Sequence, residues 1–241
     1  MGRNRGLTLV ELLVALAVVG TLLSFVYRIF LSQQRSFALQ EEVADAQQNA
    51  RLALEELSRA LASLGVGVAA GQGQVSLLVA HPDQITFNAD RSGDHNALAP
   101  GSPVPGAGPA DPYPSVPGTY ALSPAETYRY YLRADGSHHV LAREVNGGTG
   151  QQTALLIANP GLGQPLFRYH GDFDGDGVTE TLDRVDLQTS PRLAAGEPLD
   201  ALVRRIEIHV VTRTAHPDRR HSDHGGHRVT RFTTSVTLRN L

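Results

Sequence analysis

The chain has 241 residues, with 21 basic and 24 acidic side chains, a formal net charge of -3 and no Cys. Its length is sufficient for one or two domains with a buried core, and its near-neutral charge argues against nucleic-acid binding over the whole surface. The absence of Cys and Lys excludes disulfides, thiolate metal sites, Schiff-base lysines and the lysine of a phosphate-binding loop.

The amino terminus combines a basic leader with a long apolar run. Residues 1–6 are polar and basic, and residues 7–31 are almost wholly apolar, with Glu11 and Arg28 as their charged members. As a helix this run would extend about 37 Å, which exceeds the bilayer hydrocarbon thickness of about 30 Å. The basic leader favours a cytoplasmic amino terminus and an extracytoplasmic remainder. No small-residue cleavage site follows the run, so we predict an anchor rather than a secretory signal.

Glu11 lies inside the predicted membrane segment, where a charge costs on the order of 2.5–3.5 kcal/mol. The simplest alternative is a plain signal anchor with Glu11 near the interface. However, Gly6-Leu-Thr-Leu-Val-Glu11, preceded by a basic leader, resembles the signal of type IV pilins and type II secretion pseudopilins. The resemblance implies that prepilin peptidase cleaves between Gly6 and Leu7 and methylates the new amine of Leu7. It also implies a single-pass inner-membrane protein that later joins a pilus or pseudopilus filament.

Glu11 then has two candidate partners. In a filament, Glu11 of one subunit could lie beside the Leu7 amine of its neighbour. Each charge would remove the desolvation cost of the other, and the pair would set the axial register. The two groups are also four residues apart on one predicted helix, so pairing within a subunit is the alternative.

Residues 32–64 continue as a predicted amphipathic helix. Apolar residues recur every three or four positions, as in one buried helix face. Gly65 and Gly67 follow the last of them and indicate the end of the helix. We expect this face to pack on a carboxy-terminal sheet. It is formed by Leu39, Val43, Ala46, Ala50, Ala53, Leu57, Leu61 and Leu64.

Residues 65–241 predict an extracytoplasmic β-rich domain. Ala134-Asp-Gly136 predicts a hairpin turn, and we expect an antiparallel sheet packed on the helix, an α+β, type IV pilin-like fold. A Pro- and Gly-rich stretch, residues 95–119, is interpreted as a tolerated insertion, with a partner-binding loop as the alternative. The predicted strands are Gln84–Ala89, Glu126–Arg133, His138–Val145, Ala154–Ala158, Leu166–Tyr169, Leu202–Thr214 and Arg228–Arg239.

An acidic segment, residues 172–183, has the spacing of a calcium-binding loop. Carboxylates stand at its positions one, three, five, nine and twelve, and Gly177 stands at position six. Asp stands at position twelve in place of the usual Glu, and predicted strands rather than helices flank the segment. The alternative is a surface turn without an ion. The predicted Ca²⁺ ligands are the side chains of Asp172, Asp174, Asp176, Glu180 and Asp183 and the carbonyl of Val178.

A His-rich segment between the last two predicted strands could bind Zn²⁺ or Ni²⁺. Pro217, Gly225 and Gly226 indicate a hairpin loop rather than a helix face, so we interpret it as a solvated loop. Its candidate ligands are His216, Asp218, His221, Asp223, His224 and His227.

Arginines are frequent near the carboxy terminus. They could bind DNA phosphates or an acidic partner, but we interpret them as solvated strand positions paired with carboxylates. They are Arg204, Arg205, Arg213, Arg219, Arg220, Arg228 and Arg231.

The sequence contains no catalytic motif, and we expect a protein that is not an enzyme. Residues 40–57 and 228–241 resemble PilW-type minor pilins and, closely, the pseudopilin J family. The resemblance implies a minor pilin that helps to start filament assembly at the tip. Its implied partners are prepilin peptidase, other minor pilins, the major pilin and inner-membrane lipid, and it implies no cofactor other than the possible Ca²⁺. Alternatives are a type II secretion pseudopilin and a filament-displayed subunit for adhesion or DNA uptake.

Overall fold

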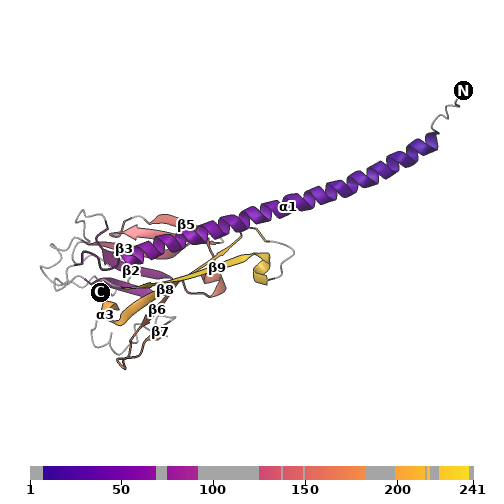
Figure 1. Cartoon of the computed structure of the whole chain (residues 1–241). Helices are drawn as coiled ribbons and strands as arrows, with labels where there is room; N and C mark the ends of the chain where they lie inside the picture. The colour runs from indigo at the N-terminus through magenta and orange to yellow at the C-terminus, as the bar shows by residue number, and fades with distance from the viewer. Residues whose placement is uncertain are drawn as a thin grey trace. The chain divides into compact units, whose positions relative to one another are not determined.

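The computed structural model confirms the α+β fold, with one long helix followed by an antiparallel sheet (Figure 1). It describes residues 8–68, 75–91, 125–136, 138–148, 150–182, 199–214, 216–217 and 223–238. The chain divides into two compact units, Met1–Ala44 and Asp45–Leu241. The predicted insertion, residues 95–119, lies outside the described residues.

Helix α1, Leu9–Ala62, is a single helix of 54 residues. The two predicted helical segments are therefore continuous, as expected for a stretch that contains no Pro. The helix ends two residues before the predicted position, and a turn follows through Gly67. Gly65 and Gly67 both have positive φ, 81° and 71°, a conformation that glycine adopts at helix ends without steric cost.

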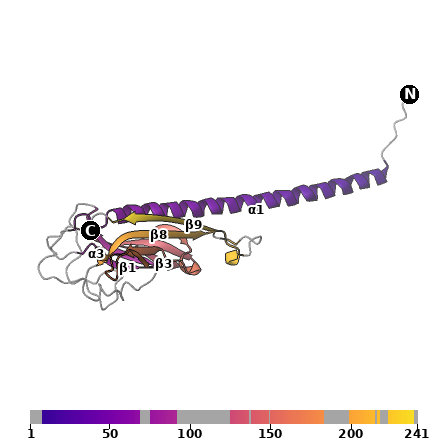
Figure 2. The ribbon, with the colours of Figure 1, turned by 60° about the horizontal axis from the view of Figure 1, so that its bottom comes forward.

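The carboxy-terminal part of α1 contributes a stripe of small and apolar side chains to the core of the second unit. Figures 1 and 2 show this part of the helix running along one face of the sheet. The predicted packing on the sheet is confirmed from Ala46 onward. The buried members of the stripe are Ala46, Ala50, Ala53, Leu57, Ala60, Leu61 and Leu64, each at most 1% exposed.

The sheet facing the helix contains nine strands within the described residues, and every strand pairing is antiparallel. Its order is β1-β2-β3-β4-β5-β8-β6-β7, and β9 pairs with β8. The strands are β1 Leu77–His81, β2 Gln84–Ala89, β3 Glu126–Asp135, β4 His138–Val145, β5 Gln151–Ile157, β6 Phe167–Gly171, β7 Glu180–Leu182, β8 Val203–Arg213 and β9 Val229–Thr237. Short helical turns lie at η2 Pro160–Leu162, α3 Leu199–Leu202 and η4 Asp223–Gly226.

Buried Asn159 joins the two parts of the sheet. Strands β5 and β8 pair only through Ile157 and Thr212. Beyond this pair, the Asn159 side chain accepts a hydrogen bond from the Val211 N–H at 2.8 Å and donates one to the His209 carbonyl at 2.6 Å. The amide group thus satisfies backbone groups of β8 where β5 no longer runs beside it.

All seven predicted strands are present, with ends that shift by up to three residues. The predicted hairpin turn is also present, because Asp135 pairs with His138 and Gly136 has a φ of 60°. Three further elements, β1, β7 and α3, were not predicted from the sequence. Strand β1 has five residues and is followed directly by Pro82, and β7 has only three residues, at the end of the acidic segment.

A partly buried polar contact fastens α1 to the sheet. The Tyr130 hydroxyl donates to Glu56 Oε1 at 2.6 Å and accepts from Arg91 Nη1 at 3.2 Å, and Arg143 Nη1 lies 3.4 Å from the same Glu56 oxygen. Burial, the hydrogen bond to Glu56 and the Glu56 charge together raise the pKa of Tyr130 to about 12, against the opposing effect of Arg91. The neutral phenol is therefore part of the native packing.

The contact predicts a loss of stability at alkaline pH. The folded-state pKa of Tyr130, about 12, lies above the unfolded value near 10, so its contribution is complete below about pH 10 and is lost as the pH rises through 12. Between pH 9.5 and 12 we expect the unfolding free energy of the wild type to fall by about 2 kcal/mol more than that of Tyr130→Phe. Denaturant titrations at several pH values measure this difference. Tyr131→Phe is the control, and equal pH slopes for the wild type and Tyr130→Phe would contradict the prediction.

Candidate functional site

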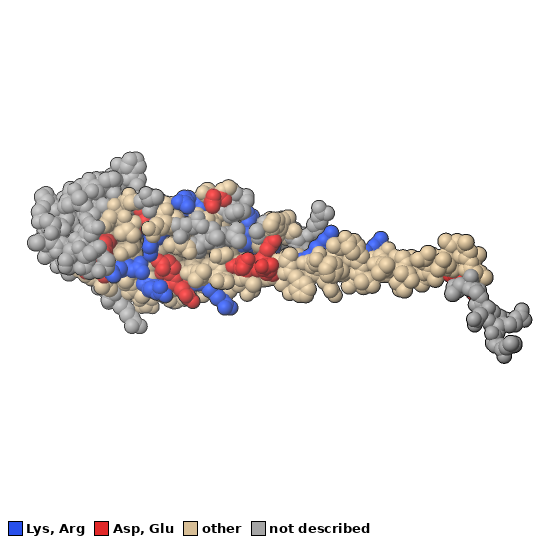
Figure 3. Space-filling model, turned by 90° about the horizontal axis from the view of Figure 1, so that it is seen from above, with Lys and Arg blue, Asp and Glu red and all other residues tan. Residues whose placement is uncertain are grey.

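The amino-terminal part of α1 exposes apolar side chains along its whole circumference. The large apolar side chains from Leu9 to Phe30 are at least 50% exposed. In Figure 3 this part of the helix is drawn almost entirely in the colour of uncharged residues. The helix is long and apolar enough to cross a membrane, and the rest of the protein buries none of its most apolar stretch. Such a surface needs lipid or neighbouring helices to cover it.

Thr8 and Glu11 form a reciprocal cap at the start of this helix. The Thr8 N–H and Oγ1–H both donate to Glu11 Oε2, at 2.9 and 3.0 Å, and the Glu11 N–H donates to Thr8 Oγ1 at 3.3 Å. This is the capping-box arrangement, in which two otherwise unpaired amides at a helix start are satisfied by side chains. Glu11 was predicted to be functional from the sequence but Thr8 was not, although the Thr-x-x-Glu spacing signals a capping box. Gly6 and Leu7, the predicted cleavage site, lie outside the described residues.

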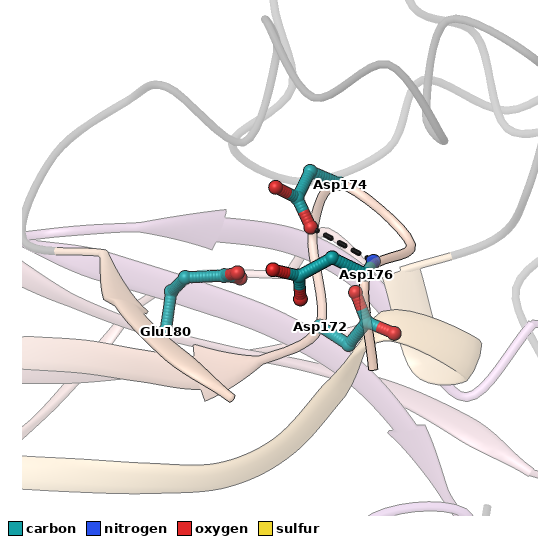
Figure 4. A group of neighbouring side chains, drawn as sticks. All are labelled: Asp172, Asp174, Asp176 and Glu180. Carbon is teal, nitrogen blue, oxygen red and sulfur yellow. Dashed lines mark hydrogen bonds between the residues drawn. The ribbon is translucent and has the colours of Figure 1, made fainter. Parts of the chain in front are cut away.

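The acidic segment forms the loop between β6 and β7. Carboxylate oxygens of Asp172, Asp174, Asp176 and Glu180 all lie within 4.8 Å of one another. Figure 4 shows these side chains gathered around one space, with Glu180 reaching in from β7. The structure therefore brings together four of the six predicted calcium ligands. Asp183 lies outside the described residues, and Val178 is on the same loop with its side chain 60% exposed.

Backbone amides of the loop hold these carboxylates in place. Asp172 accepts from the Gly175 and Gly177 N–H groups at 2.7 and 3.3 Å, and Asp174 accepts from the Asp176 N–H at 3.1 Å. Gly177 has a φ of 84°, which favours Gly at this position. A like-charge pair at 4 Å costs about 1 kcal/mol in water, so four such groups form a strongly negative centre. Carboxylate oxygens in such a cluster are the ligands that Ca²⁺ prefers.

Two features tie the start of this loop to the core. Phe173 is buried, and its N–H donates to Glu180 Oε2 at 3.0 Å. A Cβ at Gly171 would lie 2.0 Å from the Leu202 carbonyl oxygen, so a larger residue could not enter there without moving the backbone. The loop is thus tied to the core at its first residues, and strands flank it on both sides, as predicted.

The His-rich segment is only partly described. Asp218 and His221 lie outside the described residues, and the side chains of Asp223 and His224 are not described. His227 Nδ1 contacts the Thr214 carbonyl at 2.8 Å, a contact that holds the base of the loop. His216 is exposed. These described contacts fit a structural role for His227.

The described arginines are spread over two strands and their ends. Arg204 and Arg205 stand near the start of β8, Arg213 at its end, and Arg231 on β9. Arg219 and Arg220 lie outside the described residues. Carboxylate partners were predicted for these arginines. Arg205 Nη2 instead contacts a histidine, His170, at Nδ1 and 3.1 Å.

A cluster around Glu207 on β8 was not predicted from the sequence. Oε2 of Glu207 lies 3.4 Å from His170 Nε2 and 3.3 Å from His209 Nε2. Burial raises the pKa of Glu207, but the attraction of His209 and the hydrogen bonds from both histidines outweigh this and hold it below its ordinary value. His170 is far from Glu207 in the sequence, and the pairing of β6 with β8 brings the two together, whereas His209 lies on the same strand as Glu207.

A family model described as the prokaryotic N-terminal methylation motif matches residues 1–27. No curated protein and no solved structure is significantly similar to the chain. The matched residues include the predicted leader, the predicted cleavage site, Glu11 and most of the apolar run. Together with the long amino-terminal helix and the antiparallel sheet, this motif supports a type IV pilin-like prepilin anchored in the membrane by one helix.

Proposed function

We propose that the protein is a minor pilin of a type IV pilus, of the PilW type, that helps to start filament assembly at the tip. The observation that carries the proposal is the methylation motif at residues 1–27. The motif covers the start of α1, where the apolar side chains are exposed. In this proposal prepilin peptidase cleaves after Gly6 and methylates the amine of Leu7. The helix remains in the inner membrane, with its amino terminus cytoplasmic and the β-rich domain outside the cytoplasm, until the subunit enters the filament.

Assembly exchanges one apolar environment for another. The exposed apolar side chains of α1 leave lipid and pack against helices of neighbouring subunits, so little hydrophobic free energy is lost. The charges set the axial register of the subunits. A Glu11 carboxylate and a neighbour's amine each carry a desolvation cost when buried alone, and this cost is offset when the two lie side by side. The β-rich domain selects neighbours, and the proposal assigns no catalysis to it.

The Glu11 pairing predicts a defect in assembly but not in processing. In Glu11→Ala we expect normal cleavage after Gly6 and an at least roughly tenfold lower amount of subunit in sheared filaments, because truncating one partner of a desolvated charge pair costs about 2–5 kcal/mol. Mass spectrometry of the amino terminus and immunoblots of filaments measure the two effects. Glu41→Ala, which removes an exposed carboxylate from α1 outside the apolar run, is the control. Normal filament levels of Glu11→Ala would refute the register role.

A second candidate is a minor pseudopilin of type II secretion, of the J type. The same observations support it, because both systems use prepilins with this motif and this helix. Deletion of the gene separates the candidates: loss of surface pili, restored by the wild-type gene, supports the pilus. Unchanged pili together with reduced protein secretion support the pseudopilin. Unchanged pili and secretion favour a filament-displayed subunit for adhesion or DNA uptake.

We also propose that the β6–β7 loop binds Ca²⁺. The proposal is supported by the loop spacing in the sequence and by the convergence of Asp172, Asp174, Asp176 and Glu180. The carbonyl of Val178 and the side chain of Asp183 would complete a shell of six to eight oxygens. A bound cation would remove the repulsion among the carboxylates and fix the ends of β6 and β7.

The calcium site predicts measurable binding to the purified chain. We expect a dissociation constant of about 0.1–1 mM, the range of extracellular calcium modules, measured by titration calorimetry. Asp174→Asn should weaken binding at least about tenfold, because a ligand charge is removed. Asp135→Asn, which removes an exposed carboxylate from the β3–β4 turn, is the matched control. No heat at millimolar Ca²⁺ with the wild type would exclude the site.

A further inference from the structure

Strand β9 is a free edge of the sheet within the part of the chain that the structure describes. It pairs with β8 on one side along all nine of its residues, without a register shift. No strand among the described residues pairs with its other side. Figure 2 shows β9 as a long, regular arrow beside α1. Such an edge presents backbone groups that can pair with a strand of another chain.

The register decides which backbone groups of β9 point to the free side. The Leu238 N–H donates to the Arg204 carbonyl and the Thr214 N–H to the Arg228 carbonyl, both at 3.0 Å. In an antiparallel pair, such hydrogen-bonded positions alternate with positions whose N–H and C=O face the other way. The even-numbered residues of β9 therefore bond to β8. The residues whose backbone groups point to the free side are Val229, Arg231, Thr233, Ser235 and Thr237.

The other described edges of the sheet are protected against pairing, and β9 is not. Edge strand β1 has five residues and a register shift between Leu77 and Val79, and Pro82 follows it. Edge strand β7 has only three residues. Strand β9 contains no Pro and no bulge, and Arg231 is its one charged residue. Because short strands, bulges, prolines and charges are the usual protections, β9 is the described edge best suited to accept a further strand.

The core is incompletely covered along β9. Phe232, Val236 and the adjoining Leu238 pack against the core but are only partly buried. Leu54 of α1 is partly buried as well. It lies about 200° around the helix from Glu56, which faces β3, and is therefore on the flank nearer to β9. An added strand would cover these side chains if it carried apolar residues at alternate positions.

Strand β9 and the carboxy-terminal part of α1 run in the same direction (Figures 1 and 2). Thr230 pairs with Thr212, whose hydroxyl donates to Ala46, the first buried residue of the helix. The later residues of β9 pack on a core whose helix members begin at Ala50. An antiparallel β9–β9 pair between two copies would therefore make their helices run in opposite directions. Subunits anchored by the same end in one membrane cannot pair in this way.

We propose that β9 is a docking edge for a strand of a neighbouring pilin-type subunit. This inference rests on the proposed assembly function and names the surface through which the β-rich domain selects a neighbour. The incoming strand runs antiparallel to β9, so it runs opposite to the amino-terminal helix of its own subunit. Its apolar side chains lie beside Phe232 and Val236, and its polar side chains lie beside Arg231 and Ser235. Main-chain hydrogen bonds supply the affinity, and the fit of the apolar side chains supplies the specificity.

Hydrogen exchange of the purified full chain in detergent micelles tests whether the edge is free. We expect the amides of Arg231, Thr233 and Ser235 to exchange at least about a hundredfold faster than those of Phe232 and Thr234, because only the latter bond to β8. Mass spectrometry with residue-level fragmentation measures this alternation. Equal rates in the two sets would overturn the inference, and equally slow exchange would show that the chain covers its own edge.

Site-specific cross-linking in piliated cells tests for the partner. A diazirine-bearing amino acid replaces Arg231 or Ser235, and Asp135 in the exposed β3–β4 turn is the control position. From the two β9 positions we expect adducts with another subunit that carries the methylation motif. The partner residues linked from Arg231 and Ser235 should be about four apart and in reverse order, because the strands are antiparallel. Four results would each overturn the inference: adducts within the chain, adducts between two β9 strands, partner residues in the same order, or yields no higher than at Asp135.

A proline variant tests the backbone contact itself. The Ser235 N–H points to the free side, so Ser235→Pro removes no hydrogen bond to β8 but blocks pairing with an incoming strand. With the photoreactive residue at Arg231, we expect Ser235→Pro to lower the adduct yield at least about tenfold and Ser235→Ala to leave it unchanged. An unchanged yield in Ser235→Pro would contradict backbone pairing. If the proline variant does not fold, the order of the cross-linked residues decides the inference alone.

Failure of this inference is distinguishable from failure of the proposed assembly function. If deletion of the gene abolishes pili but Ser235 gives no adduct with another subunit, the assembly function stands and the docking role of β9 fails. If Glu11→Ala enters filaments normally, the register role of Glu11 fails, while ordered adducts from Arg231 and Ser235 still support pairing through β9.

Discussion

The close approach of α1 to the sheet is the contact on which the second unit depends. Ala46, Ala50, Ala53 and Ala60 stand on the helix face that meets the strands, and their small side chains allow the helix backbone to lie near the sheet. The approach is close enough for the Thr212 hydroxyl to donate directly to the Ala46 carbonyl at 3.0 Å. Larger side chains at these positions would force the two layers apart and open voids around the buried aromatic rings.

Between the alanines, larger residues of the helix fill the remaining space. Leu57 is completely buried among residues of several strands, and burial of such a side chain contributes about 1.5–3 kcal/mol. Glu56 is its neighbour in the sequence and faces the Tyr130 hydroxyl at the edge of the same interface. Apolar packing therefore supplies most of the attraction, while the Glu56 contact fixes the position of the helix along the sheet, since the hydrogen bond requires one alignment.

Regular repeats in the sequence predicted most of this architecture, and non-local contacts account for what they missed. The apolar repeat of α1 and the alternation in β2, β3, β4 and β8 are local signals, and each predicted element is present. Strand β1 was missed because four of its five residues are apolar without alternation, and it forms by pairing with β2. Glu207 and His170 were missed because they are 37 positions apart and meet only through the register of β6 with β8.

The same difference between local sequence signals and non-local contacts applies to the candidate sites. Asp172, Asp174, Asp176 and Glu180 could be grouped from the sequence because nine consecutive positions contain them, and a tight loop brings such residues together by itself. Glu11 could be selected because a carboxylate in an apolar run is costly. Thr8 was missed because a hydroxyl is inexpensive in a helix, although its spacing to Glu11 is that of the capping box that the three contacts form.

The two ends of α1 illustrate how one helix meets two different requirements. In the proposed assembly, the apolar surface at its start is exchanged between lipid and other helices, so specificity cannot come from hydrophobic burial and depends on the few polar groups near Glu11. At its end, the surface is buried permanently against one sheet, so small side chains and a few polar contacts are enough to define its place. A charge at the exchanging end can specify a neighbour because its burial is costly whenever the correct partner is absent.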